Sequence, residues 1–377
     1  MASTPAAGAG AVVQTHSFLT WDGGVIPSTD PAGIAYVPLS GHLIISDSEI
    51  DEEEEWQNQN IFEVGRSGAP LYGSYVTQPV GGASYEPAGI AFNPVDGRIY
   101  VVNDNQGMLY QYILIGGQFV LTGNWDLTGS PYFLHDPEGI TANTFSGRLF
   151  IADGASGGRK VSTISIEGPE LTLHSSFDVS DRILDPEGIA FDPETRHVFI
   201  VSTPDLTVFE YTPTGLFVDE YDISGLDPPP ITPQGLTFGP ASFGAGAWSL
   251  YISDGGIDNN MGPNYQDGWV YEVLLMDPAA ADDPLPADAE SSLRLAPSFP
   301  NPSGDGFVIP FALSRELPLT LCIFGPRGEL VRTLFTGSLP SGSHEIRWDA
   351  GDAPAGTYFC ELRSGPHRAR RKLLVLK

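Results

Sequence analysis

The chain has 377 residues, of which 41% are hydrophobic, 11% aromatic and 17% charged. This composition excludes an intrinsically disordered chain, and the length allows two or more domains. The 44 Gly and 33 Pro residues follow no collagen-like period, so they favour many short strands joined by tight turns over helical bundles. No apolar run approaches the roughly 20 residues of a membrane-spanning helix, so we expect no membrane span.

Charge is unevenly distributed along the chain. Residues 1–292 contain 7 basic and 40 acidic residues, a balance of −33, whereas residues 293–377 contain 11 basic and 7 acidic residues, a balance of +4. An acidic body repels phosphate backbones, which excludes nucleic acid as a partner, and its natural counter-ions are divalent cations. The change in charge also predicts a domain boundary, with residues 277–292, rich in Pro, Ala and Asp, as a linker.

The amino-terminal segment and the cysteines bear on the cellular location. Residues 1–15 lack the charged segment and apolar core of a signal peptide, but their Ala/Gly run resembles the remainder of a cleaved one. We therefore interpret 1–15 as a processed segment and expect a secreted or cell-surface protein. Strand-like alternation places Cys322 and Cys360 on opposite faces, so we expect two free thiols rather than a disulfide.

A motif of the form Pro-x-Gly followed by a short apolar strand recurs five times. Its glycines, spaced 56, 50, 49 and 47 residues apart, are Gly33, Gly89, Gly139, Gly188 and Gly235. Each copy continues with a β-branched second strand that ends in Asp or Asn, and then with a third and a fourth strand. A period near 50 residues with four strands per repeat is typical of β-propeller blades.

The fifth copy contains only three strands and ends at VYEVLL (270–275). The segment HSFLTWDG (16–23), which precedes the first copy, fits the missing fourth strand. We therefore predict an all-β chain with a five-bladed β-propeller over residues 16–276, closed by its amino-terminal strand. Such closure removes an open sheet edge. Six blades, with one repeat too degenerate to detect, is the alternative.

The repeats resemble a known class of propeller. The copies DPEGITANTFSGRLFIADGA (136–155) and DPEGIAFDPETRHVFIVSTP (185–204) are similar to those of bacterial extracellular propellers with NHL-like or SdiA-regulated-type repeats. The resemblance covers about residues 16–276 and implies the propeller fold. It does not imply one activity, because repeats of this style occur in binding proteins, lactonases and phytase-like esterases.

The carboxy-terminal residues 293–377 resemble a second family. The matching segments, in chain order, are PNPS (300–303), LTLCIFGPRGELVRTL (319–334), LPSGSHEIRWDA (339–350), APAGTYFCEL (353–362) and RKLLVLK (371–377). They are similar to the sorting domain of type IX secretion cargo and to the immunoglobulin-like domain of flagellar hook-capping proteins. The resemblance implies an Ig-like β-sandwich and the type IX secretion machinery as partner.

Acidic residues of the repeats point to a metal site. In a four-stranded blade, the turn that enters the first strand and the turn after the second strand lie at the same end. Carboxylate and amide oxygens on such loops suit Ca²⁺ better than Zn²⁺ or Mg²⁺, although Asp and Asn at turns also cap their own backbone. The predicted metal ligands are Glu138, Glu187, Gln234, Asp47, Asp153, Asp254, Asp258 and Asp267.

Catalytic motifs are not evident, and no catalytic residue is assigned. GASGG (154–158) has the Gly-x-Ser-x-Gly pattern, but it falls in a predicted β-hairpin rather than in the strand-to-helix turn that a nucleophile elbow requires. We therefore favour a calcium-binding propeller that acts as a binding or adhesion module for an unknown small-molecule, glycan or protein ligand. The alternative is a divalent-metal-dependent hydrolase of the lactonase or phytase/esterase type that uses the same acidic face.

Overall fold

The computed structural model contains β-strands and turns. It describes residues 10–21, 28–49, 59–75, 86–115, 118–242, 248–257, 267–276, 293–295, 298, 303, 306–313, 316–325, 329–340, 342–364 and 367–375. The secondary-structure elements of these residues are all strands, and none of the described segments forms a helix able to cross a membrane. The chain divides into two compact units, residues 1–239 with 249–278 and residues 240–248 with 279–377.

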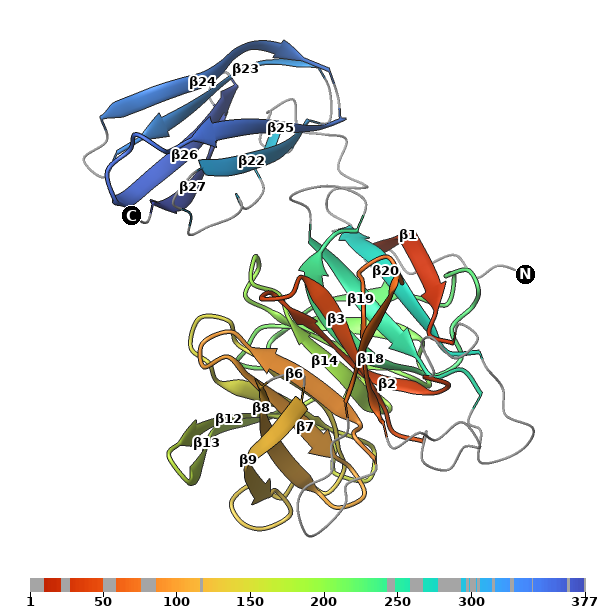
Figure 1. Cartoon of the computed structure of the whole chain (residues 1–377). Helices are drawn as coiled ribbons and strands as arrows, with labels where there is room; N and C mark the ends of the chain where they lie inside the picture. The colour runs from red at the N-terminus through yellow and green to blue at the C-terminus, as the bar shows by residue number, and fades with distance from the viewer. Residues whose placement is uncertain are drawn as a thin grey trace. The chain divides into compact units, whose positions relative to one another are not determined.

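The first unit consists of five antiparallel sheets of four strands each (Figure 1). In four of them the strands are consecutive in the chain. The sheets are β2 (Pro31–Val37), β3 (His42–Asp47), β4 (Ile61–Val64) and β5 (Pro70–Tyr75); β6 (Gly89–Asn93), β7 (Arg98–Asn103), β8 (Met108–Ile115) and β9 (Gln118–Asp126); β10 (Pro137–Ala142), β11 (Leu149–Asp153), β12 (Lys160–Glu167) and β13 (Glu170–Asp178); β14 (Pro186–Phe191), β15 (Val198–Ser202), β16 (Thr207–Tyr211) and β17 (Phe217–Asp222); and β18 (Pro233–Pro240), β19 (Trp248–Asp254) and β20 (Trp269–Met276) with β1 (Ala11–Leu19).

The first strands of the five sheets approach one another in a closed ring. At each of the five motif glycines, the backbone of the next first strand lies so near that a methyl group would collide with it. The distances from such a methyl carbon to the neighbouring carbonyl oxygen are 2.7 Å for Gly33 to Ala88, 2.4 Å for Gly89 to Glu138, 2.3 Å for Gly139 to Glu187, 2.6 Å for Gly188 to Gln234 and 2.3 Å for Gly235 to Ala32. The recurring glycine is therefore a requirement of this contact between sheets.

The amino-terminal strand completes the last sheet, as predicted. β1 pairs antiparallel with β20, and its register places His16 opposite Glu272 and Leu19 opposite Trp269. The segment before β1 also reaches the preceding sheet, because the Gly10 amide donates a hydrogen bond of 2.9 Å to the Glu220 carbonyl. The two ends of the propeller region are thus joined by backbone hydrogen bonds.

The alternation along β1 provides a matched test of this closure. Val12 packs against the buried cluster that contains Tyr271 and Val273, whereas Val13 is 46% exposed. We expect Val12→Asp to lower the free energy of unfolding by about 2 kcal/mol, because it forces a carboxylate against apolar side chains. Val13→Asp should change it by less than about 0.5 kcal/mol. Chemical denaturation measures both, and equal effects would contradict a closing role for β1.

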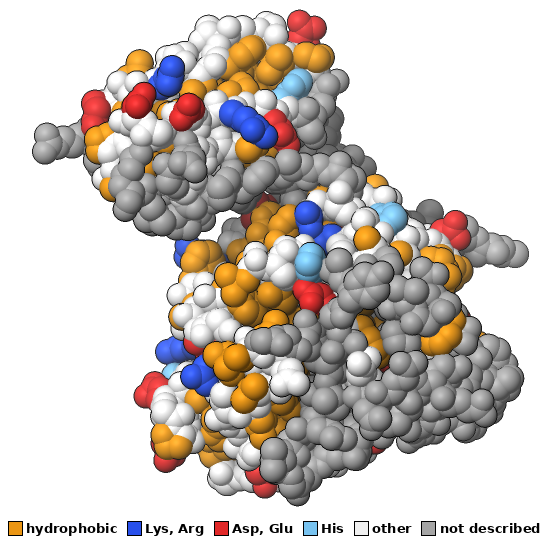
Figure 2. Space-filling view, in the orientation of Figure 1, with side chains coloured by type: hydrophobic (Ala, Val, Ile, Leu, Met, Phe, Trp, Pro, Cys, Tyr) orange, Lys and Arg blue, Asp and Glu red, His pale blue; other side chains and the backbone are white. Residues whose placement is uncertain are grey.

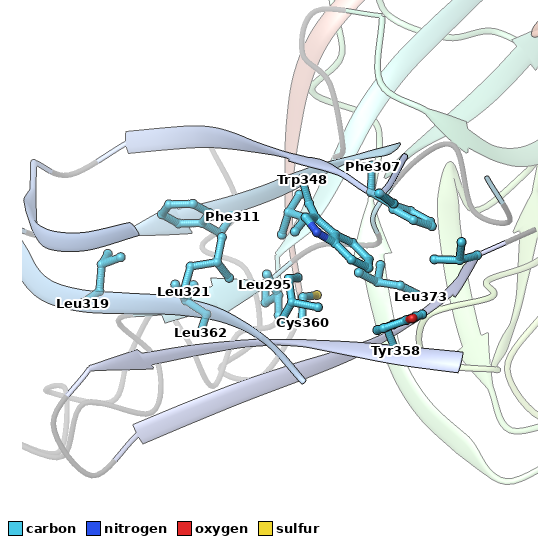
Figure 3. Close-up of a cluster of buried hydrophobic side chains, with 14 of the residues drawn as sticks. Leu295, Phe307, Phe311, Leu319, Leu321, Trp348, Tyr358, Cys360, Leu362 and Leu373 are labelled. Carbon is cyan, nitrogen blue, oxygen red and sulfur yellow. The ribbon is translucent and has the colours of Figure 1, made fainter. Parts of the chain in front are cut away.

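The second unit has two sheets that share one core (Figure 3). One sheet has the order β21 (Leu293–Leu295), β22 (Gly306–Leu313) and β25 (Gly342–Asp349). The other has the order β24 (Leu330–Leu339), β23 (Leu317–Phe324), β26 (Gly356–Ser364) and β27 (His367–Val375). The Trp348 ring stacks on Phe307 at 5.4 Å and meets Tyr358 edge-on at 5.2 Å. Cys360 is buried in this core, Cys322 is partly exposed on the other face, and both are free thiols, as predicted.

Candidate functional site

Polar residues at the ends of the second strands fasten the turns that enter the first strands. Three aspartates accept hydrogen bonds from the backbone amides of those turns. The acceptor and donor pairs are Asp47 with Asp30 (3.1 Å), Asp153 with Asp136 (2.9 Å) and Asp254 with Thr232 (2.6 Å). In the other two sheets, Asn103 donates to the Glu86 carbonyl at 2.9 Å and the Ser202 hydroxyl accepts from the Asp185 amide at 3.4 Å. One structural cap therefore recurs in all five sheets.

Three predicted metal ligands, Asp47, Asp153 and Asp254, are thus engaged as buried backbone caps. Burial raises the pKa of Asp153 and of Asp254, and the backbone hydrogen bonds offset part of that rise. A second oxygen of Asp153 lies 3.6 Å from the Lys160 ammonium. These contacts give each carboxylate a role in holding the loops, whatever else it binds.

Glu138 and Glu187 differ from the caps, because neither carboxylate has a hydrogen-bond or ion-pair partner among the described residues. Each follows the proline that opens its strand, Glu138 on β10 and Glu187 on β14. Both residues are partly exposed. Even so, burial by the surrounding protein is the largest cause of their raised pKa values. The pKa of Glu187 rises to about 8, and that of Glu138 rises well above its usual value, with the Glu187 charge as the second cause.

Three further carboxylates add to the negative potential at this pair, and they were not among the predicted ligands. Asp104, Asp136 and Asp185 each raise the pKa of both glutamates by charge repulsion. Asp104 follows β7, and its buried Oδ1 has no hydrogen-bond partner among the residues that the structure describes. We define the axial acidic cluster as Asp104, Asp136, Glu138, Asp185 and Glu187. It extends over the sheets that begin with β6, β10 and β14.

The hairpin between β11 and β12 borders this cluster. It contains Ser156 of the Gly-x-Ser-x-Gly pattern, in a turn between two strands, as predicted. The Ser156 amide donates to Asp136 at 2.9 Å, and the Ala155 amide donates to Asp185 at 2.7 Å. The loop therefore holds the two aspartates, and its serine has no nucleophile-elbow geometry.

The remaining predicted ligands are spread around the ring. Gln234 occupies on β18 the position that Glu187 has on β14. The Asp267 carboxylate accepts a hydrogen bond of 3.3 Å from the Ile257 amide, and Asp258 lies outside the described residues. Within the described part of the chain, no three His, Cys, Asp or Glu side chains come together in a group that could hold a metal ion. Glu138, Glu187 and Gln234 supply the hard oxygens that Ca²⁺ prefers but do not form a closed coordination shell.

Few of the described cationic side chains interact with the cluster or its neighbouring caps. Lys160 donates to the Phe133 carbonyl at 2.6 Å and pairs with Asp153, and Arg159 lowers the pKa of Asp185 only in part. On the face that Figure 2 displays, Lys and Arg side chains stand scattered among hydrophobic and uncharged ones. The cluster therefore contains more acidic groups than these cations compensate, which favours a cationic ligand.

Four of the first strands, β2, β6, β10 and β18, border a small cavity. The cavity has a volume of about 30 Å³. Its lining includes residues two positions after x in the Pro-x-Gly motif, among them Ile34, Ile90, Ile140 and Leu236. This volume has room for about one water molecule.

Comparisons with known proteins find distant structural likenesses. No family model and no curated protein matches the chain. A chain of the nidogen/laminin complex is 20% identical, with 61% of this chain and 73% of that chain covered and a TM-score of 0.40. The gluconolactonase XC5397 from Xanthomonas campestris is 13% identical, with 73% and 99% covered and a TM-score of 0.38. The PQQ-bound aldose sugar dehydrogenase from Streptomyces coelicolor is 13% identical, with 72% and 100% covered and a TM-score of 0.41.

At these scores the likenesses carry no argument about what this chain binds or catalyses. The sheet order and the contacts between first strands are those of a β-propeller, and the secondary-structure elements of the described residues are all strands.

Proposed function

We propose that the first unit is a five-bladed β-propeller and that it works as a cation-dependent binding module. The blade count is supported by the five four-stranded sheets and by the closed sequence of contacts from Gly33 to Gly235. The observation that carries the binding function is the pair Glu138 and Glu187, two carboxylates without partners among the described residues. A protein rarely leaves such groups uncompensated unless a ligand compensates them.

Calcium is the inorganic cation proposed for this site. Glu138, Glu187 and Gln234 would supply oxygen ligands from three neighbouring first strands, and water would complete the shell. Bound Ca²⁺ would offset the repulsion within the axial acidic cluster and hold an anionic or hydroxyl-bearing ligand. Adhesion, secretion and surface location are part of the same proposal and are supported by the sequence resemblances described above.

The second unit is proposed to be an Ig-like sorting domain read by the type IX secretion machinery. Its two sheets with a common core agree with that proposal, as does the terminal strand β27, which carries the RKLLV part of the matching motif. In this interpretation the propeller binds the ligand and the second unit directs export.

A hydrolase remains the second candidate, on one observation. The raised pKa of Glu187, about 8, keeps this group largely protonated at neutral pH beside the aspartates of the cluster. A protonated carboxyl of this kind can act as a general acid toward an ester or a lactone. The described residues near it include no base–nucleophile pair in hydrogen-bond contact, so binding is the better supported function.

Calcium titration of the full chain tests the proposal. We expect saturable heat in isothermal titration calorimetry, and a melting temperature that falls when a chelator is added, because a cation bound to the folded state alone adds about 2.7 kcal/mol at a hundredfold excess over Kd. The double variant Glu138→Gln/Glu187→Gln should lose both effects. Glu170→Gln is the matched control, since this exposed glutamate begins β13, at the opposite end of the sheet from Glu138. Calcium heat that survives in the double variant would place the metal elsewhere and contradict the proposal.

A further inference from the structure

The x position of the Pro-x-Gly motif gives the axial site two different walls. Glu138 and Glu187 form an acidic wall, on β10 and β14. The same motif position is Ala32 on β2 and Ala88 directly before β6, and both alanines are buried, with 4% and 8% of their surface exposed. The site is therefore charged on one side and small and apolar on the other. An elongated ligand with a charged end and an apolar body would match this asymmetry.

An organic cation also suits carboxylates on different strands more readily than Ca²⁺ does. Ca²⁺ needs six to eight oxygens at about 2.3–2.6 Å. The described His, Cys, Asp and Glu side chains gather in no group of three that could hold a metal. An ammonium or guanidinium group makes a weaker demand, because its N–H donors reach separate carboxylates at about 2.7–2.9 Å from nitrogen to oxygen. Three to five donors can thus serve carboxylates that lie on different strands.

Exposed apolar side chains lie in three of the connections at the same end of the ring. Leu184 is 53% exposed and directly precedes Asp185 of the cluster, and Ile231 is 48% exposed and directly precedes Thr232. Phe133, at 52% exposed, lies in the corresponding connection from β9 to β10. These connections enter the strands that carry Glu138, Glu187 and Gln234, so their apolar side chains lie at the glutamate end of the propeller. We call Phe133, Leu184 and Ile231 the apolar rim.

We propose that the natural ligand of this site is an organic cation, a small molecule with an ammonium or guanidinium group attached to an apolar body. The cationic group would lie against Glu138 and Glu187, and the body would extend past the apolar rim. This inference rests on the proposed function as a cation-dependent binding module and specifies its ligand class. Burial of the apolar body contributes affinity by the hydrophobic effect, and the unpartnered carboxylates select for positive charge.

Three matched probes test the ligand class by isothermal titration calorimetry on the full chain. 4-Phenylbutylamine carries both features, 4-phenylbutan-1-ol lacks the charge, and butylamine lacks the aromatic body. We expect saturable one-to-one binding of 4-phenylbutylamine, at least tenfold weaker binding of the other two probes, and competition between 4-phenylbutylamine and Ca²⁺. Glu138→Gln and Glu187→Gln should each weaken 4-phenylbutylamine at least tenfold, whereas the distant Glu170→Gln should leave its Kd unchanged.

Variants of the rim separate its contribution from that of the charge. Leu184→Ser and Ile231→Ser alter exposed side chains, so the fold should tolerate them. Each is expected to weaken 4-phenylbutylamine three- to tenfold and to leave butylamine unchanged. If both variants bind 4-phenylbutylamine like the wild type, or if the alcohol binds as tightly as the amine, the inference is wrong.

The outcomes distinguish this inference from the function on which it rests. Calcium binding that depends on Glu138 and Glu187, without binding of 4-phenylbutylamine, would overturn the organic-cation ligand and leave the cation-dependent module intact. The absence of binding of both Ca²⁺ and 4-phenylbutylamine would overturn both. Amine binding that persists in the double variant Glu138→Gln/Glu187→Gln would place the probe at another site and would also overturn the inference.

Discussion

Gly139→Ala is expected to destabilise the propeller by more than about 3 kcal/mol, the upper part of the range for added atoms in a packed interior. The new methyl carbon would lie 2.3 Å from the Glu187 carbonyl oxygen and 2.8 Å from the Ile189 amide nitrogen. Both atoms belong to the backbone of β14, which cannot move aside as a flexible side chain could. The substitution would therefore separate β10 from β14 and strain the whole ring.

Gly129→Ala is the matched control for this prediction. Gly129 lies in the connection from β9 to β10, and a methyl group there meets no atom within 4 Å. Its effect on the free energy of unfolding should stay within about 0.5 kcal/mol. Urea denaturation of the two variants measures the difference. Similar stabilities would show that the first strands are not held as close together as the structure places them.

The ring could be predicted from the sequence because the close contact between first strands requires a glycine in every repeat. The five motif glycines stand where one first strand meets the next, and only a residue without a side chain fits there. The role of β1 was likewise foreseeable, since a repeat with three strands demands a fourth. The exact ends of β1 were not, because backbone pairing with β20 continues to Ala11, beyond the apolar pattern that begins near residue 16.

The site was harder to predict, because one residue type serves two purposes. An aspartate at the end of a second strand has the same local sequence whether it caps a turn or binds a cation, and Asp47, Asp153 and Asp254 all act as caps. The glutamates differ by position. Glu138 and Glu187 follow a proline that already opens the strand, so no local backbone group remains for them to cap.

Asp104, Asp136 and Asp185 illustrate the other limit. Their influence on Glu138 and Glu187 depends on the order of sheets around the ring, which a single repeat does not contain. Asp104 differs from the residue at the same position in other copies, for example Gly154 after β11. This difference is the only local sign that the position is special. Acidic residues that are ordinary within each repeat thus become a cluster only after ring closure.

The same cluster makes the stability of the propeller depend on pH. Glu187 has a folded-state pKa of about 8, against an ordinary value of 4.5, so the folded chain binds the proton more tightly than the unfolded chain. The stabilisation is therefore complete below about pH 4.5 and is lost as the pH rises through 8. We expect the wild type to lose roughly 3–4 kcal/mol between pH 5 and pH 8 from this group, at about 1.4 kcal/mol for each pH unit.

Glu187→Gln isolates this contribution, because the amide has the shape of the protonated acid and cannot ionise. The variant should match the wild type near pH 5 and exceed it by roughly 3 kcal/mol at pH 8, in buffers free of divalent cations and amines. Urea denaturation at each pH measures the difference, and Glu170→Gln, which removes an exposed charge from β13, should follow the wild-type curve. Parallel curves for wild type and Glu187→Gln would mean that Glu187 ionises freely in the folded chain. The site would then have no electrostatic strain for a cation to relieve, and the binding proposal would lose its physical basis. A rise in stability confined to high pH would instead identify Glu187 as a residue retained at a cost to the fold, which is the behaviour expected of a ligand-binding group.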